Sequence, residues 1–182
     1  MKILCYRHPK PLGGDQLCYG QTDLDIDDVE RMMMTKILKP LVSKREVHFY
    51  TSPLKRCVKI ANSLGRPYVI EPALQEISFG LYDGLPWDKV PRQDLDLWAQ
   101  DVEGYHFPGG ESYKDLRERV RTFLCLLGEK SLKEGESILL LTHAGVMRAL
   151  MDLIEGKGIL ETLKIPLDYG GCLELNWSHD FV

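Results

Sequence analysis

One stretch, SILLLTHAG at residues 137–145, restricts the fold of this chain more than any other. Its residues from Ile138 to Leu141 are all apolar, without the alternation that a half-exposed strand would show. Such a run is typical of a parallel strand that helices cover on both faces. Short apolar segments also alternate with amphipathic segments along the rest of the chain. The sequence therefore predicts an α/β fold, a three-layer α/β/α sandwich with a mostly parallel central sheet.

Four further strands and four helices are expected around that run. The strands are placed at 2–6 (KILCY), 47–51 (VHFYT), 68–74 (YVIEPAL) and 172–177 (CLELNW). The helices are placed at 25–41, 52–67, 112–130 and 146–156. The third helix has the clearest start signal, because Ser112 can cap it and Asp115 stands at the N3 position.

The first two helices have start and stop signals of their own. Asp27 is expected to cap the first helix, and Pro40 is expected to end it. Ser52 is expected to cap the second helix, with Pro53 as its first residue. The three methionines at 32–34 are interpreted as core residues rather than as a binding surface.

At 182 residues the chain most simply forms one domain, spanning 1–182. Residues 75–110 are rich in glycine and proline and are expected to be irregular, with a short helix. A small cap insertion is expected near 85–107, because long connections often carry function. Its aromatic residues are open to two interpretations, a surface that stacks on a substrate or the core beneath a cap: Trp87, Trp98, Tyr105 and Phe107.

Charge and composition argue against several classes of protein. The net charge of −4 disfavours non-specific nucleic-acid binding, which needs a basic surface. No apolar run approaches 18 residues and the start of the chain lacks a signal-peptide core, so no membrane partner is expected. The five cysteines form no C-x-x-C pair and are expected to be mostly buried thiols in a reducing compartment. We therefore expect a cytoplasmic protein without a metal or cofactor.

Basic residues follow three of the predicted strands. Arg7 and His8 come directly after the first strand, Arg56 lies in the first turn of the helix after the second, and His143 follows the apolar run. Ligands bind beyond the carboxyl ends of the strands in open α/β sheets. Arginine forks match phosphate oxygens, and a helix N-terminus adds N–H donors. The sequence therefore predicts a phosphate site at this edge of the sheet.

These residues also lie in five ordered motifs that resemble those of the histidine phosphatase superfamily, the phosphoglycerate-mutase-like group. The resemblance spans nearly the whole chain. Among the departures from the family pattern, Pro9 replaces a glycine, Ile60 a threonine and Asp83 a glutamate, and the loop after Pro9 departs further. The motifs are RHP at 7–9, TSPLKRCVKIA at 51–61, LQEISFGLYDG at 74–84, PGGES at 108–112 and THAGVMR at 142–148.

The resemblance implies a phosphoglycerate mutase-like fold and a role for each matched residue. His8 would be the nucleophile that becomes phosphorylated, and Glu76 the proton donor to the leaving oxygen. Arg7, Arg56 and His143 would hold the phosphoryl oxygens. The chemistry agrees, because a neutral imidazole is nucleophilic near pH 7 and phosphoryl transfer needs positioning and charge neutralisation. The implied activity is that of a metal-independent phosphomonoesterase.

The segment CYGQTDLDI at 18–26 looks most like that of alpha-ribazole phosphatases, members of the same family from the cobalamin pathway. This resemblance implies that Gln21 and Thr22 take part in substrate binding. The expected partner is a small phosphorylated substrate, with alpha-ribazole 5′-phosphate as the first choice. Whether the chain forms a homodimer is left open.

Pro9 is the departure closest to the predicted nucleophile. A proline has no N–H and a fixed φ, so one donor to the phosphoryl group is lost. The same proline favours an extended conformation at His8, which suits the end of a strand. The expected cost is at most one oxyanion contact.

Three alternatives to the phosphatase stay open. The chain would be a non-catalytic phosphate-binding or phosphoprotein-binding module if Pro9 marks lost chemistry, although a pure phosphate binder gains nothing from Glu76. It would be a phosphoglycerate mutase-type phosphoryl transferase, although it lacks the long insertions of mutases. A metal hydrolase is the weakest alternative, because the sequence has no H-E-x-x-H motif.

Overall fold

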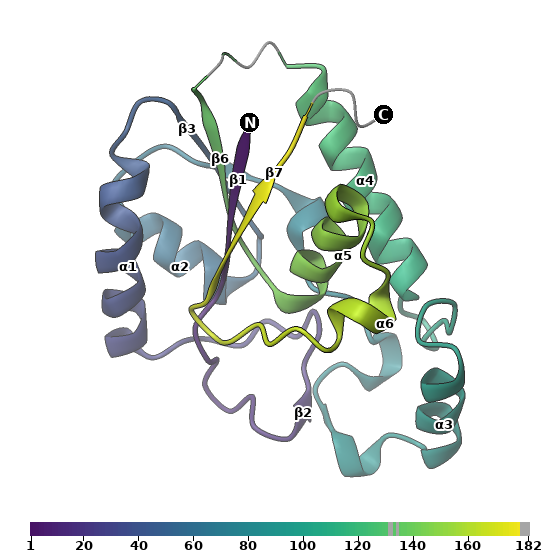
Figure 1. Cartoon of the computed structure of the whole chain (residues 1–182). Coiled ribbons are helices and arrows are strands. Elements are labelled where there is room, and N and C mark those ends of the chain that lie inside the picture. Colours follow the sequence, from purple (N-terminus) through teal and green to yellow (C-terminus); the bar gives the residue numbers. More distant parts are fainter. Residues whose placement is uncertain (131–132, 134, 179–182) are drawn as a thin grey trace.

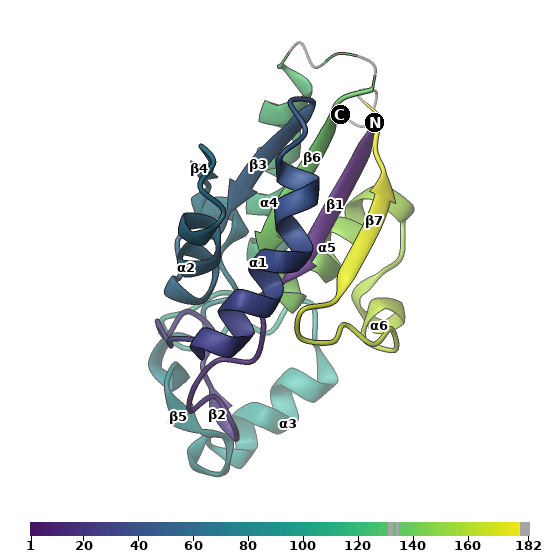
Figure 2. The same cartoon turned by 90° about the vertical axis from the view of Figure 1, so that its left-hand side faces the viewer.

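The computed structural model describes residues 1–130, 133 and 135–178. Its centre is a five-stranded sheet with the strand order β4-β3-β6-β1-β7. The strands are β1 (Lys2–Arg7), β3 (Val47–Thr51), β4 (Val69–Ile70), β6 (Ser137–Thr142) and β7 (Cys172–Asn176). All neighbouring pairs are parallel except β1 and β7, which are antiparallel. The prediction of a mostly parallel sheet is confirmed, and Figure 2 shows the strands in this order.

Helices cover both faces of the sheet (Figure 1). Helices α1 (Asp28–Val42) and α2 (Lys55–Ser63) lie on one face, and α4 (Tyr113–Gly128) and α5 (Ala144–Glu155) on the other. The β6 strand explains this arrangement, because its side chains alternate between two apolar clusters. Ile138 and Leu140 pack with α4 and α5, whereas Leu139 and Leu141 pack with α1 and α2. All four side chains are fully buried, as expected for a strand covered on both faces.

Short elements lie beyond the carboxyl ends of the strands. The segment predicted to be irregular, 75–110, contains the helix α3 (Arg92–Gln100) and the 3₁₀ turns η2 (Gly80–Tyr82) and η3 (Trp87–Lys89), and the 3₁₀ turn η1 (Pro72–Leu74) comes just before it. Strands β2 (Leu17–Cys18) and β5 (Leu85–Pro86) pair in a separate two-stranded sheet. Helix α6 (Ile159–Thr162) follows α5 and is seen above α3 in Figure 1. No helix in the described part of the chain is long and apolar enough to cross a membrane.

The start signals of α1 and α4 are confirmed. The Asp27 side chain accepts from the Val29 N–H at 2.7 Å. Ser112 and Asp115 form a capping box, in which each side chain accepts from the other residue's backbone N–H. Pro40, however, lies inside α1, which continues to Val42. The prediction that Pro40 ends the helix is wrong because it stands in the last turn, where its missing N–H removes a single bond.

Two further predictions about the helices on the α1 face are wrong. Helix α2 begins at Lys55 rather than at Ser52, although the Ser52 hydroxyl accepts from the Leu54 N–H at 3.3 Å as well as contacting His143. Of the three methionines, Met34 is buried, but Met32 and Met33 are about three-fifths exposed. Consecutive helix positions are 100° apart, so three in a row cannot all face the sheet.

The segment expected to form a strand at 68–74 forms one only at Val69 and Ile70. The next residue, Glu71, caps the η1 turn by accepting from the Ala73 N–H. Pro72 follows it at the first position of that turn, where a proline is tolerated because no N–H is needed.

Candidate active site

Three neighbouring strands bring the predicted basic residues together. His8 follows β1, Arg56 lies in α2 after β3, and His143 follows β6. The Arg56 Nε atom lies 3.2 Å from His8 Nε2 and 3.3 Å from His143 Nδ1. The centroids of the two imidazole rings are 4.9 Å apart. The structure therefore places these three side chains in one buried cluster at the carboxyl ends of the strands, as the sequence predicts.

His8 is held as a neutral imidazole with a defined tautomer. Its Nδ1 atom lies 2.6 Å from the carbonyl oxygen of Pro9, to which it donates a hydrogen bond. Its Nε2 atom then carries the lone pair and accepts from Arg56. Burial, followed by the Arg56 guanidinium, holds the pKa of His8 well below its ordinary value. An imidazole in this state is nucleophilic at Nε2 at neutral pH.

The contact with Pro9 shows what this proline contributes. Pro9 is buried, and it accepts the His8 hydrogen bond through its backbone carbonyl, a group that every residue has. The N–H that a proline lacks is not part of the bond that orients His8. Pro9 therefore leaves the orientation of the predicted nucleophile intact.

Arg56 is fully buried and is fixed by backbone as well as by the histidines. Its Nη1 donates to the carbonyl of Thr22 at 2.8 Å, and its Nη2 donates to the carbonyl of Gly20 at 2.6 Å. Thr22 was predicted to bind the substrate, which stays a prediction; in the structure its backbone carbonyl holds the guanidinium. The whole 18–26 segment is anchored to the cluster in this way.

Arg7 lies against the segment that leads into β7. Its Nη1 donates to the carbonyl of Leu167 at 2.6 Å, and its Cζ lies 3.8 Å from the centroid of the Tyr169 ring. Its Nε is buried and has no hydrogen-bond partner among the described residues. One donor of Arg7 is therefore left over after the contacts that orient the side chain.

His143 stands at the N-terminus of α5 and is also fully buried. Because its Nδ1 accepts from Arg56, its Nε2 carries the proton and donates to the Ser52 hydroxyl at 2.8 Å. Burial lowers the pKa of His143 most, and Arg56 lowers it further. Sequence reasoning missed this role of Ser52, although the serine is the first letter of the S-x-L-x-R motif. The hydroxyl orients His143 and also accepts from the Leu54 N–H just before α2.

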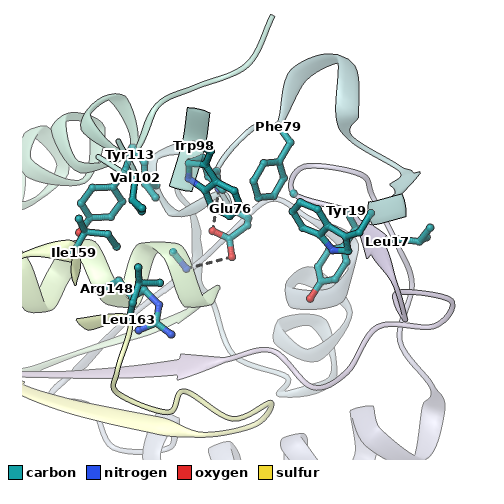
Figure 3. A pocket seen from close by; sticks show the side chains of 15 residues that line it. Leu17, Tyr19, Glu76, Phe79, Trp98, Val102, Tyr113, Arg148, Ile159 and Leu163 are labelled. Atoms are coloured by element: carbon teal, nitrogen blue, oxygen red, sulfur yellow. Dashed lines mark hydrogen bonds between the residues drawn. The ribbon is translucent and has the colours of Figure 1, made fainter. Parts of the chain in front are cut away.

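Glu76 contacts the first turn of α5, two residues after His143. Its Oε1 accepts from the Ile77 N–H at 2.9 Å, and its Oε2 accepts from the Gly145 N–H at 3.2 Å, in the first turn of α5 (Figure 3). A Cβ atom at Gly145 would lie 2.2 Å from Oε1, so a side chain there would displace the carboxylate. Gln21 donates from Nε2 to the backbone carbonyl of Glu76 at 3.0 Å. Gln21 thus supports the loop that carries Glu76.

A second set of contacts clamps that loop from behind, and we call it the Glu76 clasp: Glu111, Arg119, Gly80 and Gly110. Arg119 donates to the carbonyl of Glu76 at 3.0 Å and pairs with Glu111 at 2.8 Å. Glu111 also accepts from the Ser78 N–H at 2.9 Å. A Cβ at Gly80 would lie 2.4 Å from the Gly110 nitrogen, so the two glycines allow the two loops to touch. The clasp explains the PGGES motif, whereas Arg119 was missed because it lies outside every motif.

Two tyrosines that sequence reasoning also missed lie beside His8. The hydroxyl groups of Tyr19 and Tyr169 are 2.8 Å apart, and their ring centroids lie 6.5 and 5.8 Å from that of His8. The Cζ atom of Arg56 lies 5.2 Å from the Tyr19 ring centroid, in the range of a cation–π contact. No single segment of the sequence signals this pair, because its members are 150 positions apart.

A cavity of about 270 Å³ opens next to Glu76 (Figure 3). Trp87 and Trp98 line it with nearly parallel rings, 6.2 Å between centroids, whereas Phe107 is buried in the cluster beneath them. Tyr105 packs against that cluster and does not line the cavity. Each interpretation of the aromatic residues therefore fits two of the four: the two tryptophans face a cavity, and Tyr105 and Phe107 belong to the core.

No group of three or more His, Cys, Asp or Glu side chains is placed to hold a metal ion within residues 1–130, 133 and 135–178. Of the five cysteines, three are buried and Cys172 is exposed. The residues of the site with basic or acidic side chains are two histidines, two arginines and one glutamate.

The buried histidines predict a pH dependence of stability. Their pKa values are lowered in the folded chain, whereas unfolded histidines titrate near pH 6.5. As the pH falls from 6.5 to 5, each histidine therefore gains a proton only on unfolding. The free energy of unfolding is expected to fall by up to about 1.4 kcal/mol per pH unit for each of the two. Urea denaturation at several pH values measures this, and a His8→Asn variant should show a shallower slope; a flat profile in the wild type would contradict the assignment of neutral buried histidines.

Comparisons with known proteins identify the family of this chain. The sequence pattern of the Histidine phosphatase superfamily (branch 1) matches residues 3–181. The chain is 33% identical over 130 residues to a 6-phosphofructo-2-kinase/fructose-2,6-bisphosphatase of Gallus gallus, covering 69% of this chain. It spans only about a quarter of that relative, 27%. It is also 25% identical over 164 residues to the putative phosphoserine phosphatase 2 of Hydrogenobacter thermophilus, covering 86% of this chain and 79% of the relative.

Solved structures show the same architecture. A phosphoglycerate mutase from Thermus thermophilus superposes with a TM-score of 0.73 at 26% identity, covering 97% of this chain and 94% of that one. A mycobacterial glucosyl-3-phosphoglycerate phosphatase has a TM-score of 0.79 at 19% identity, covering 99% and 92%, and so shares the fold. With the family pattern matched over nearly its full length, the chain belongs to the histidine phosphatase superfamily, branch 1.

Proposed function

We propose that this protein is a metal-independent phosphomonoesterase that works through a phosphohistidine at His8. The observation that carries the proposal is the position of Arg56 Nε between His8 Nε2 and His143 Nδ1, at 3.2 and 3.3 Å. A phosphoryl group in line with His8 Nε2 would lie beside the Arg56 guanidinium, whose positive charge would face the phosphoryl oxygens. Charge neutralisation of this kind supplies most of the catalysis of phosphoryl transfer.

The first step transfers the phosphoryl group to the enzyme. The lone pair of His8 Nε2 forms the bond to phosphorus, and the bond to the leaving oxygen breaks. Glu76 gives its proton to that oxygen, and the alcohol departs. The Nδ1 proton stays hydrogen-bonded to the carbonyl of Pro9, which disperses the charge that the ring gains.

The second step returns the enzyme to its starting state. Glu76 takes a proton from a water molecule, whose oxygen attacks phosphorus as the bond to His8 Nε2 breaks. Inorganic phosphate leaves, with Glu76 protonated again for the next cycle. Arg7 supports both steps, because its buried Nε donor has no protein partner in the described chain and a phosphoryl oxygen would satisfy it.

For the substrate, we propose a small phosphomonoester, with alpha-ribazole 5′-phosphate as the first candidate. The likeness of the 18–26 segment to alpha-ribazole phosphatases supports it, as does the tryptophan pair beside Glu76, which suits an aromatic base. In the same proposal the enzyme is cytoplasmic and needs no cofactor.

The decisive experiment follows the phosphoryl group. Purified protein with EDTA is given p-nitrophenyl phosphate, alpha-ribazole 5′-phosphate, 3-phosphoglycerate and a sugar phosphate, and phosphate release is measured. A rapid acid-free quench should trap an enzyme-bound phosphoryl group on the peptide that contains His8. Loss of activity with the chelator would point to a metal hydrolase, and isomerisation of 3-phosphoglycerate without release would point to a mutase. No turnover by the folded protein would leave a phosphate-binding module.

The proposed role of Glu76 predicts a dependence on the leaving group. Glu76→Gln keeps the size of the side chain but cannot donate a proton, so turnover of an alkyl phosphate is expected to fall about 10²–10⁴-fold. The p-nitrophenolate group leaves without a proton, so the first step with p-nitrophenyl phosphate should lose much less. Single-turnover rates for the two esters measure the difference. An equal loss for both would mean that Glu76 acts by holding the α5 N-terminus. Glu71→Gln, a cap of η1 outside the site, is the matched control.

A further inference from the structure

The cavity beside Glu76 lies where the alcohol part of a substrate would lie in the proposed reaction. Glu76 and Gly145 line it, and Tyr19 lines it on the side that faces His8. A group that leaves His8 toward the proton of Glu76 would therefore enter this cavity. The chemistry of its walls should select the alcohol.

The walls of the cavity are apolar. They come from the segment before α3, from α3 itself, from the buried face of α4, and from α6: Ile77, Phe79, Trp87, Trp98, Tyr113, Leu116, Ile159 and Leu163. The Phe79 ring stands edge-on to Trp87, at 5.6 Å between centroids. Aromatic rings set in this way present both faces and edges to a ligand ring. An apolar alcohol would lose its contact with water on binding here, and the burial of its apolar surface would favour binding.

A second anionic group would find poor support in the same place. Among the described residues that line the cavity, the charged ones are Glu76 and Arg148. Glu76 repels an anion when it is ionised. Arg148 donates through Nη1 to the carbonyls of Thr162 and Ile165, and Figure 3 shows its guanidinium pointing away from the aromatic wall. A carboxylate held against the aromatic wall would lose its hydration there without reaching the Arg148 guanidinium, which points away from that wall.

We infer that this site selects phosphate monoesters of uncharged apolar alcohols, above all those that carry an aromatic ring, and rejects esters with a second acidic group. The inference rests on the proposed function and adds to it the class of alcohol. It makes the aromatic wall a specificity determinant that acts on the leaving group and not on the phosphoryl group.

The test compares three esters of unactivated primary alcohols, so that leaving-group reactivity is alike: propyl, 3-phenylpropyl and 3-carboxypropyl phosphate. We expect kcat/KM for the phenylpropyl ester to exceed that for the propyl ester at least about 30-fold. We expect the carboxypropyl ester to fall about tenfold below the propyl ester. Equal values for all three, or a preference for the carboxylate, would overturn the inference and leave the phosphatase in place.

A charge-insertion variant tests the wall directly. Leu163 lines the cavity from the end of α6 and is about half exposed, so Leu163→Lys adds a cation without burying it fully. Its carboxypropyl-to-phenylpropyl ratio of kcat/KM is expected to rise about tenfold or more. Leu160→Lys, on the same helix, is about two-thirds exposed and does not line the cavity, so it is the matched control. An unchanged ratio in Leu163→Lys would place the alcohol elsewhere.

Binding separates a failure of this inference from a failure of the proposed function. Propylphosphonate and 3-phenylpropylphosphonate have no ester bond to hydrolyse, and their Kd values for the unaltered protein need no catalysis. A Kd at least about tenfold lower for the phenylpropyl compound, with no hydrolysis of any ester, would contradict the phosphatase and support the apolar site. Equal Kd values together with hydrolysis would overturn the apolar site alone.

Discussion

His8→Ala is expected to lower kcat/KM for any phosphomonoester that this protein hydrolyses by about 10⁴-fold or more. The side chain would form the bond to phosphorus through Nε2. Its contacts with Pro9 at Nδ1 and with Arg56 at Nε2 orient it for this role. Losses of this size are typical when the nucleophile of a covalent mechanism is removed. Steady-state kinetics with p-nitrophenyl phosphate measure the loss. The enzyme-bound phosphoryl group should disappear with it.

His106→Ala is the matched control for that variant. The His106 side chain is largely exposed and pairs with Asp115, at the start of α4, away from the site. Its removal should leave kcat/KM within about twofold of the unaltered protein. If His8→Ala kept more than a hundredth of the activity, another group would have to attack phosphorus, and the assignment of the nucleophile would be wrong.

Arg56→Met is expected to have the second largest effect, on activity and on stability together. The variant removes the cation between the two imidazoles and the donor to the carbonyl of Gly20, whereas the carbonyl of Thr22 keeps the Leu24 N–H at 2.9 Å. We expect kcat/KM to fall at least about 10³-fold, as for other groups that stabilise transferring charge. One buried carbonyl without a donor, that of Gly20, should lower the free energy of unfolding by about 1–3 kcal/mol.

Arg56→Lys separates charge from geometry. A lysine keeps the positive charge but cannot fork to four acceptors, so it should recover little of the activity. Lys59→Met, which removes a cation that pairs with Asp25 at the surface of the same helix, is the matched control. Activity above a tenth of the original in Arg56→Met, measured on protein shown by circular dichroism to be folded, would make Arg56 a structural residue.

The sequence was most informative where local patterns meet a rule of topology. The apolar run at β6 predicts a doubly covered strand, and the ends of parallel strands meet at one edge of the sheet. Those two facts are enough to bring Arg7, His8, Arg56 and His143 together. The capping box at Ser112 is equally local, since all its partners lie within four residues.

The rest depends on contacts between distant segments, which no local pattern encodes. Tyr19 meets Tyr169, and Arg7 is oriented by Leu167. Ser52 was interpreted as a helix cap because its neighbours fit one, but its hydroxyl also holds a histidine 91 positions away, and α2 begins only at Lys55. Tertiary contacts override local preference in such cases, and the partner is visible only in the folded chain.

The Glu76 clasp has a consequence for how loss-of-function variants of this protein would be classified. Glu111, Arg119 and Gly110 hold the backbone on either side of Glu76, yet none of the three lines the cavity or lies in the histidine cluster. A random-mutagenesis screen scored only on turnover would therefore return them beside His8, as if they were part of the chemistry. Scoring the same library for folded protein as well as for turnover would keep the two groups together, because the clasp fixes a loop and not the core. Only the leaving-group dependence of the first step would tell them apart, since a displaced Glu76 spares that step for an ester whose alcohol departs without a proton.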